Sequence, residues 1–177
     1  MRTLILGSAS SGKSAFAEDL AVRRQTDRRV YLATMHTHGP EDERRVQRHR
    51  VLRAGKGFAT IERYTDLGGV PLPRGCCCLV ECMSNVLANE MYDPDGAKER
   101  AVEKMLADLD RLAGRAAQLI VVSNEIFSDG AEYDDFCTRY IDHLGAVNRA
   151  LAASSDEVIE VVAGMPLYWK GGASCGC

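Results

Sequence analysis

The sequence predicts an α/β fold in which helices flank a mostly parallel central sheet. Short apolar runs alternate along the chain with longer stretches that carry apolar residues at helical spacing, a pattern typical of parallel sheets with crossover helices. A glycine-rich turn directly after the first apolar run favours the same class. The 177 residues suffice for one such domain and are too few for two. We therefore expect residues 1–177 to form a single domain, with 170–177 as a flexible tail.

The predicted elements follow from the spacing of apolar residues. Five short runs, each ending at a turn or a polar cluster, are expected to be buried strands: Thr3–Leu6, Val30–Ala33, Cys76–Val80, Gln118–Val122 and Val158–Ala163. Helices are expected over Lys13–Arg24 and around two stripes of three- and four-residue spacing, Val102–Leu112 and Phe136–Leu151, and both stripes should lie in the core. Asp93–Gly96 is a predicted turn, and Gly68–Gly75 is a predicted surface connection.

Charge and composition exclude several classes of function. Lys and Arg number 22 against 25 Asp and Glu, so the formal net charge of -3 provides no broad positive field for binding nucleic acid. No apolar run approaches the roughly 20 residues that cross a bilayer, and the N-terminal apolar stretch is too short for a signal peptide, so we expect a cytoplasmic protein. Three of the seven cysteines are adjacent, Cys76–Cys78, which favours buried thiols over disulfides. We assign no role to Cys175 and Cys177.

The segment between the first strand and the first helix carries a phosphate-binding motif. Its residues fit the pattern GxxxxGK[ST]: Gly7, Ser8, Ala9, Ser10, Ser11, Gly12, Lys13 and Ser14. Between a strand and a helix, the backbone N–H groups of this motif surround phosphates, its lysine reaches the β- and γ-phosphates, and its serine ligates Mg²⁺. We therefore predict a P-loop NTPase-like fold, with Lys13 and Ser14 at a nucleotide site.

Polar side chains that follow two later strands are candidates for the same site. Glu81 comes directly after Cys76–Val80, where it would assist Ser14 in holding Mg²⁺ if this strand is next to the first one. The alternative is a solvated residue that ends the strand. Asn124 and Glu125 follow the next predicted strand, and they could contact substrate or cap the following turn.

The charged segment Glu41–Arg53 has few apolar residues where a crossover helix should pack on the sheet. On a helix, Arg45, His49 and Arg53 would share one face. Neighbouring cations lower the pKa of an imidazole, and guanidinium groups neutralise phosphate, so this arrangement suits a histidine that attacks phosphorus. From spacing alone, however, a solvated surface histidine is the commoner alternative. The same surface interpretation applies to His36, His38 and His143.

Six segments occur along the chain in an order that is characteristic of one enzyme family. They are LILGSASSGKSAFAE, VYLAT, RVQRHRVLR, LVECMSNVLANEM, VVSNE and GAVNRALAASSDEVIEVVAGMPLYWK. With these segments the chain resembles, over most of its length, the bifunctional adenosylcobinamide kinases and adenosylcobinamide-phosphate guanylyltransferases of cobalamin biosynthesis. Residues 55–58 and 126–133 depart from the usual pattern of that family.

The resemblance implies a homotrimer that phosphorylates the aminopropanol hydroxyl of adenosylcobinamide with ATP or GTP. It then implies transfer of GMP from GTP onto that phosphate through a guanylylated histidine, with Mg²⁺ as cofactor. The family's nucleophile corresponds to His49, its phosphate loop to Gly7–Ser14, and its acidic residue after the third strand to Glu81. The predicted site therefore comprises His49 and Lys13 as catalytic residues, Gly7–Ser14, Arg50, Arg53, Glu62 and Glu81 as nucleotide-binding residues, and Ser14 and Glu81 as metal ligands.

Two other functions stay open on the sequence. One is a P-loop kinase of another small alcohol, in which His49 is a surface residue. The other is a nucleotide-gated binding module that forms no covalent intermediate. Detection of GMP bound to the protein would favour the cobinamide kinase and guanylyltransferase over both of these alternatives.

Overall fold

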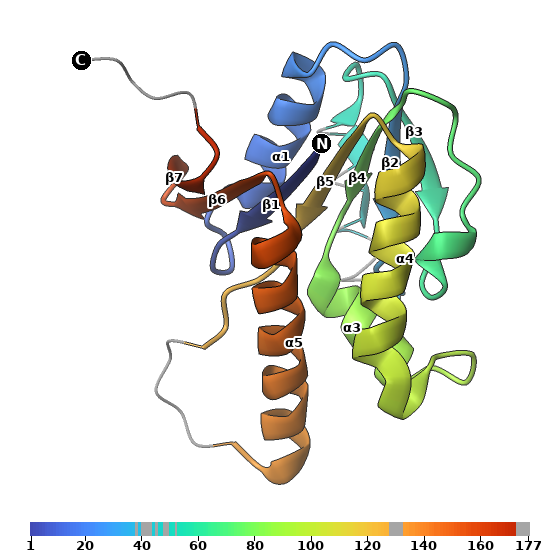
Figure 1. Cartoon of the computed structure of the whole chain (residues 1–177), viewed down its shortest axis with the longest axis vertical. Coiled ribbons are helices and arrows are strands. Elements are labelled where there is room, and N and C mark those ends of the chain that lie inside the picture. Colours follow the sequence, from blue (N-terminus) through green and yellow to red (C-terminus); the bar gives the residue numbers. More distant parts are fainter. Residues whose placement is uncertain are drawn as a thin grey trace.

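The computed structural model describes residues 1–37, 39, 44, 46–47, 50–51, 53–127 and 133–172 (Figure 1). Within these residues, seven strands form one sheet in the order β3-β2-β4-β5-β1-β6-β7. The strands are β1 (Arg2–Leu6), β2 (Arg29–Ala33), β3 (Phe58–Glu62), β4 (Cys77–Val80), β5 (Gln118–Val122), β6 (Glu157–Val162) and β7 (Met165–Lys170). All neighbours pair in parallel except β6 and β7, so the predicted fold class is confirmed.

Helices cover both faces of the sheet. They are α1 (Lys13–Arg23), α3 (Met83–Tyr92), α4 (Ala101–Arg115) and α5 (Asp135–Ser154), with short 3₁₀ turns η1 (Leu67–Gly69) and η2 (Lys98–Arg100). Figure 1 shows α1 on one face and α3, α4 and α5 on the other. Among residues 44–53, the described ones are helical as well. No described helix has the length and apolar character that a bilayer crossing requires.

The core has two layers because parallel strands with helices on both sides are buried on both faces. Leu4, Cys76 and Cys78 pack with α3, α4 and α5, whereas Ile5 and Cys77 pack with α1. The cysteines among the described residues are free, and burial raises the pKa of the Cys77 thiol to about 11. This confirms the expectation of buried thiols that act as small apolar side chains.

The five predicted strands are confirmed to within about a residue, but three elements were not predicted. Strand β3 lies at a sheet edge with a mixed pattern of exposure, so it lacks the apolar run of a buried strand. Strand β7 is largely apolar but contains Pro166, which is unfavourable inside a strand, and all of its residues are exposed. Helix α3 buries Ser84, Asn89 and Glu90 among its apolar residues. Polar residues on the buried face of a helix conceal its periodicity.

Two expectations about burial were wrong. Phe136 does not lie in the core: its side chain is 54% exposed and stacks on Tyr92, because the first turns of α5 extend past the end of the sheet (Figure 1). The connection Gly68–Gly75 is also not wholly at the surface. Gly68 and Val70 are buried, and the Arg115 guanidinium donates hydrogen bonds to both of their carbonyl oxygens.

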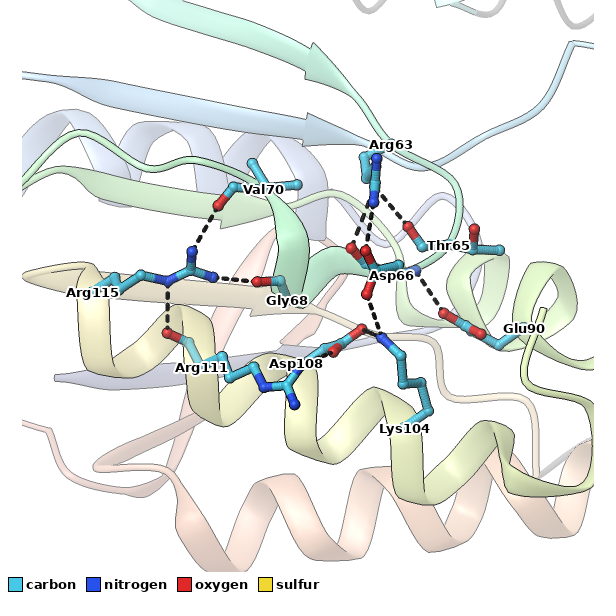
Figure 2. A network of polar contacts seen from close by, with 10 residues as sticks. All are labelled: Arg63, Thr65, Asp66, Gly68, Val70, Glu90, Lys104, Asp108, Arg111 and Arg115. Atoms are coloured by element: carbon cyan, nitrogen blue, oxygen red, sulfur yellow. Dashed lines mark hydrogen bonds and ion pairs between the residues drawn. The ribbon is translucent and has the colours of Figure 1, made fainter. Parts of the chain in front are cut away.

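A polar network fastens this connection to α4 and α3 (Figure 2). The Asp66 carboxylate accepts hydrogen bonds from Arg63 and Lys104, and the Asp66 N–H donates to Glu90. Lys104 also forms an ion pair with Asp108, whose side chain is almost wholly buried. The network therefore fixes the chain directly after β3, where the cavity described below has one of its walls.

Candidate functional site

The phosphate loop connects β1 to α1 in the strand-to-helix context predicted for it. Two of its residues have positive φ, Ser10 at 59° and Gly12 at 91°, so the backbone turns tightly before the helix begins. Gly7 lies so close to its neighbours that a Cβ there would be 2.5 Å from Ser11 Oγ and 2.7 Å from the Val161 carbonyl oxygen. A side chain at this position would force the loop and β6 apart.

The start of α1 is available to an anion. Its N-cap residue, Gly12, provides no side chain to accept hydrogen bonds from the first N–H groups, whereas the Asp134 side chain caps α5 by accepting from the Cys137 N–H. Uncapped N–H groups and the helix dipole together favour a phosphate at such an end. The Lys13 ammonium donates to the Ser8 carbonyl oxygen at 2.9 Å, so the side chain lies against the phosphate loop.

A cavity of about 590 Å³ opens at the carboxyl ends of β2, β3 and β4. Its walls include four of the predicted nucleotide-binding residues, which come from separate parts of the sequence. They are Arg50, Arg53, Glu62 and Glu81. The structure thus brings these four together, while Lys13 and Ser14 are not among the described residues that line this cavity.

Among the charged side chains in the described lining of the cavity, that of Arg53 is the buried one. Only 7% of the residue is exposed, and its guanidinium carbon lies 3.6 Å from the centre of the Tyr31 ring. The buried Nε and Nη1 atoms have no hydrogen-bond partner among the described residues. Burying N–H donors of a cation without acceptors is costly, and the charge of an anionic ligand in the cavity would offset part of that cost.

Glu81 also lines the cavity, but its strand, β4, is not a neighbour of β1 as the expectation required. The order of strands places β5 between β4 and β1, so Glu81 is not on a strand adjacent to the phosphate loop. One of its oxygens accepts a hydrogen bond from the Thr34 N–H at 3.0 Å. Burial, assisted by the Glu81 carboxylate, raises the pKa of Tyr31, so the Tyr31 hydroxyl stays protonated near neutral pH.

Arg50 and Glu62 form an ion pair across the cavity wall, with 2.5 Å between Nη2 and Oε1. Both side chains are about half exposed, so a ligand can compete for either one. The Tyr64 hydroxyl donates to the second oxygen of Glu62 at 3.4 Å. Sequence reasoning missed Tyr64 because strand β3 was not recognised; with that strand assigned, Tyr64 would have been placed just beyond its carboxyl end, where ligands of such sheets bind.

Two predicted residues, His49 and Arg45, lie outside the described residues. Asn124 and Glu125 do not line this cavity. Instead, the Asn124 amide donates to Ser84 Oγ at 2.8 Å and the Glu125 N–H donates to the Gly7 carbonyl oxygen at 3.0 Å. This segment therefore ties the end of β5 to α3 and to the start of the phosphate loop.

Comparison with known proteins points to one family. Residues 3–168 match the model of the family described as cobinamide kinase / cobinamide phosphate guanyltransferase. A bifunctional adenosylcobalamin biosynthesis protein of Pseudomonas aeruginosa is 34% identical over 97% of this chain and 98% of its own. A protein of the same description from Escherichia coli is 28% identical over 96% of this chain and 100% of its own.

The fold is also found in a solved ATPase of a bacterial type III secretion system. That structure superposes with a TM-score of 0.54 and 11% identity, covering 90% of this chain and 50% of the ATPase chain. At this level of identity the likeness supports the fold class alone.

Proposed function

Since this chain belongs to the cobinamide kinase / cobinamide phosphate guanyltransferase family, we infer that it phosphorylates adenosylcobinamide and transfers GMP from GTP to the phosphate so formed. The product of the second reaction is adenosylcobinamide-GDP, an intermediate of cobalamin biosynthesis. The observation that best supports a nucleotide phosphate in the cavity is the buried Arg53 guanidinium, whose Nε and Nη1 atoms have no acceptor among the described residues.

In the kinase reaction, the alcohol oxygen of the substrate attacks the γ-phosphorus and the nucleoside diphosphate leaves. The phosphate loop binds the nucleotide through its N–H groups, and Lys13 neutralises charge on the β- and γ-phosphates. Ser14 and Glu81 would hold Mg²⁺ through a hydroxyl and a carboxylate, which are oxygen ligands that suit this ion, and the bound ion would offset negative charge on the phosphates.

In the transferase reaction, a nitrogen of His49 attacks the α-phosphorus of GTP and pyrophosphate leaves. The substrate phosphate then attacks the phosphorus of the histidine-bound GMP, and the bond to the imidazole breaks. Arg50 and Arg53 offset the negative charge that accumulates on the phosphate oxygens in both steps. The two arginines lie at the cavity wall, and they follow residue 49 in the sequence by one and four positions, which supports this assignment.

We also propose that the protein acts in the cytoplasm as a homotrimer. Strand β7 exposes Met165, Leu167 and Trp169, with Trp169 70% exposed. Apolar side chains gathered at an exposed sheet edge are typical of a surface that another chain covers. These residues support self-association through the β6–β7 hairpin.

A labelling experiment tests the covalent step. The protein is incubated with Mg²⁺ and GTP labelled on the α-phosphate, denatured, and examined for acid-labile label on the protein. We expect label on the wild type and none on His49→Ala. His143→Ala is the matched control, since His143 lies on α5 with its Nδ1 2.6 Å from the Arg139 carbonyl oxygen, away from the cavity.

Two results would contradict the proposal. Label retained in His49→Ala would remove that residue as nucleophile. No label on any variant, with nucleotide binding intact, would instead favour a kinase of another small alcohol or a nucleotide-gated module.

A further inference from the structure

His36 does not behave as the surface residue expected from the sequence. Its Nε2 lies 2.7 Å from Asp93 Oδ2, and its ring stacks on Tyr64 with 3.9 Å between the ring centres and 26° between the planes. Tyr64 in turn lines the cavity. His36 thus packs directly behind a wall of the nucleotide site.

The contacts continue from Tyr64 to Arg50. The Tyr64 hydroxyl bonds one oxygen of Glu62, and the other oxygen of Glu62 pairs with Arg50. Each contact restricts the rotamers of the next side chain. Asp93, His36, Tyr64, Glu62 and Arg50 therefore form one continuous series, which we call the Asp93–Arg50 relay.

The far end of the relay is fixed to α3. The Asp93 N–H donates to the Asn89 carbonyl oxygen at 2.9 Å and closes the last turn of that helix. The buried Asn89 amide donates to the carbonyl oxygens of Thr34 and Tyr64 at 2.9 and 3.0 Å. Helix α3 thus holds the chain on both sides of the His36–Tyr64 stack, so the stack has a rigid base.

We propose that His36 and Tyr64 are positioning residues for guanylyl transfer: through Glu62 they hold the Arg50 guanidinium in place at the cavity wall. The inference rests on the proposed function, because it requires Arg50 to offset phosphate charge during guanylyl transfer. The relay does not include the phosphate loop. It should therefore matter for the step at the α-phosphorus and not for phosphorylation with ATP.

The test compares the two reactions in His36→Ala, in Tyr64→Leu and in the double variant. Misplacing a reacting group by about 1 Å can slow a reaction by about 100-fold, so each single variant should slow the appearance of protein-bound GMP by about 10-fold or more. In His36→Ala, whose altered residue does not line the cavity, phosphorylation of adenosylcobinamide with ATP should stay within about 2-fold of wild type. If the two residues act in one series, the double variant should be no slower than the slower single variant.

Several outcomes would overturn the inference. They are labelling at the wild-type rate in both single variants, an equal loss of kinase and transferase activity, and a double variant in which the two losses multiply. His143→Ala serves again as the histidine control and should change neither reaction. Failure of the underlying function is distinguishable, since the wild-type protein itself would then carry no label at His49.

Discussion

Replacing Arg53 with methionine should stabilise the ligand-free protein and at the same time remove its response to GTP. In the folded state Nε and Nη1 of Arg53 are buried without hydrogen-bond partners among the described residues. Each such donor costs about 1–3 kcal/mol. The contact with the Tyr31 ring returns about 2 kcal/mol at a desolvated site. Methionine keeps most of the packing of the aliphatic stem, so the two donor costs less the ring contact leave a net stabilisation of about 0–4 kcal/mol.

Thermal unfolding with and without GTP measures both effects. A gain of 1 kcal/mol corresponds to about 2–4 °C in Tm for a domain of this size. Wild-type protein should gain about 2.7 kcal/mol at a GTP concentration 100 times its Kd, and Arg53→Met should lose most of that gain. Arg74→Met is the control, because Arg74 is exposed in the loop before β4 and its loss should change stability by less than about 0.5 kcal/mol.

The reasoning fails if Arg53→Met is less stable than wild type by more than about 1 kcal/mol without nucleotide. That result would mean that the buried guanidinium stabilises the fold and is no evidence for a ligand. If the Tm of Arg53→Met rose with GTP as much as that of wild type, Arg53 would have no part in nucleotide binding.

Two further predictions concern the phosphate loop and the network of Figure 2. Lys13→Ala should abolish both phosphorylation and the formation of protein-bound GMP, and an active Lys13→Ala protein in either assay would contradict a shared role for the loop. The hydrogen bond from Lys104 lowers the pKa of Asp66 in the folded state below its ordinary value of 3.8. The ionised carboxylate therefore stabilises the fold fully at pH values above 3.8. This contribution is lost as the pH falls through the lower pKa of the folded state. In urea unfolding, the difference in stability between wild type and Asp66→Asn should accordingly be largest near neutral pH and vanish at strongly acidic pH. A difference that does not depend on pH would argue against the ion pair of Asp66 with Lys104 as its source.

Local sequence patterns were enough to predict the phosphate loop. The strand Arg2–Leu6, the loop and α1 are consecutive in the chain, and their geometry depends on contacts over a few residues. Gly12 adopts a positive φ and α1 starts without a side-chain cap, as the motif requires. The buried strands were equally visible, because burial on both faces leaves continuous apolar runs.

The cavity was not predictable in the same way. Glu81 was expected beside the phosphate loop, but its position depends on which strands are neighbours, and β5 lies between β4 and β1. His36 was interpreted as a surface residue because nothing near it in sequence indicates Tyr64 or Asp93 as a partner. Those contacts join residues 28 and 57 positions apart and form only when β2, β3 and the end of α3 meet.

The sequence by itself determined that this protein is an α/β domain with a phosphate loop, and its ordered motifs indicated the family. Each of these features depends on residues that are close together in the sequence. The tertiary structure alone decided that Arg53 is buried over Tyr31, that Arg50, Glu62 and Glu81 share one cavity, and that His36 supports its wall. The physical reason is that burial and charge pairing depend on the order and register of strands, which bring distant segments into contact.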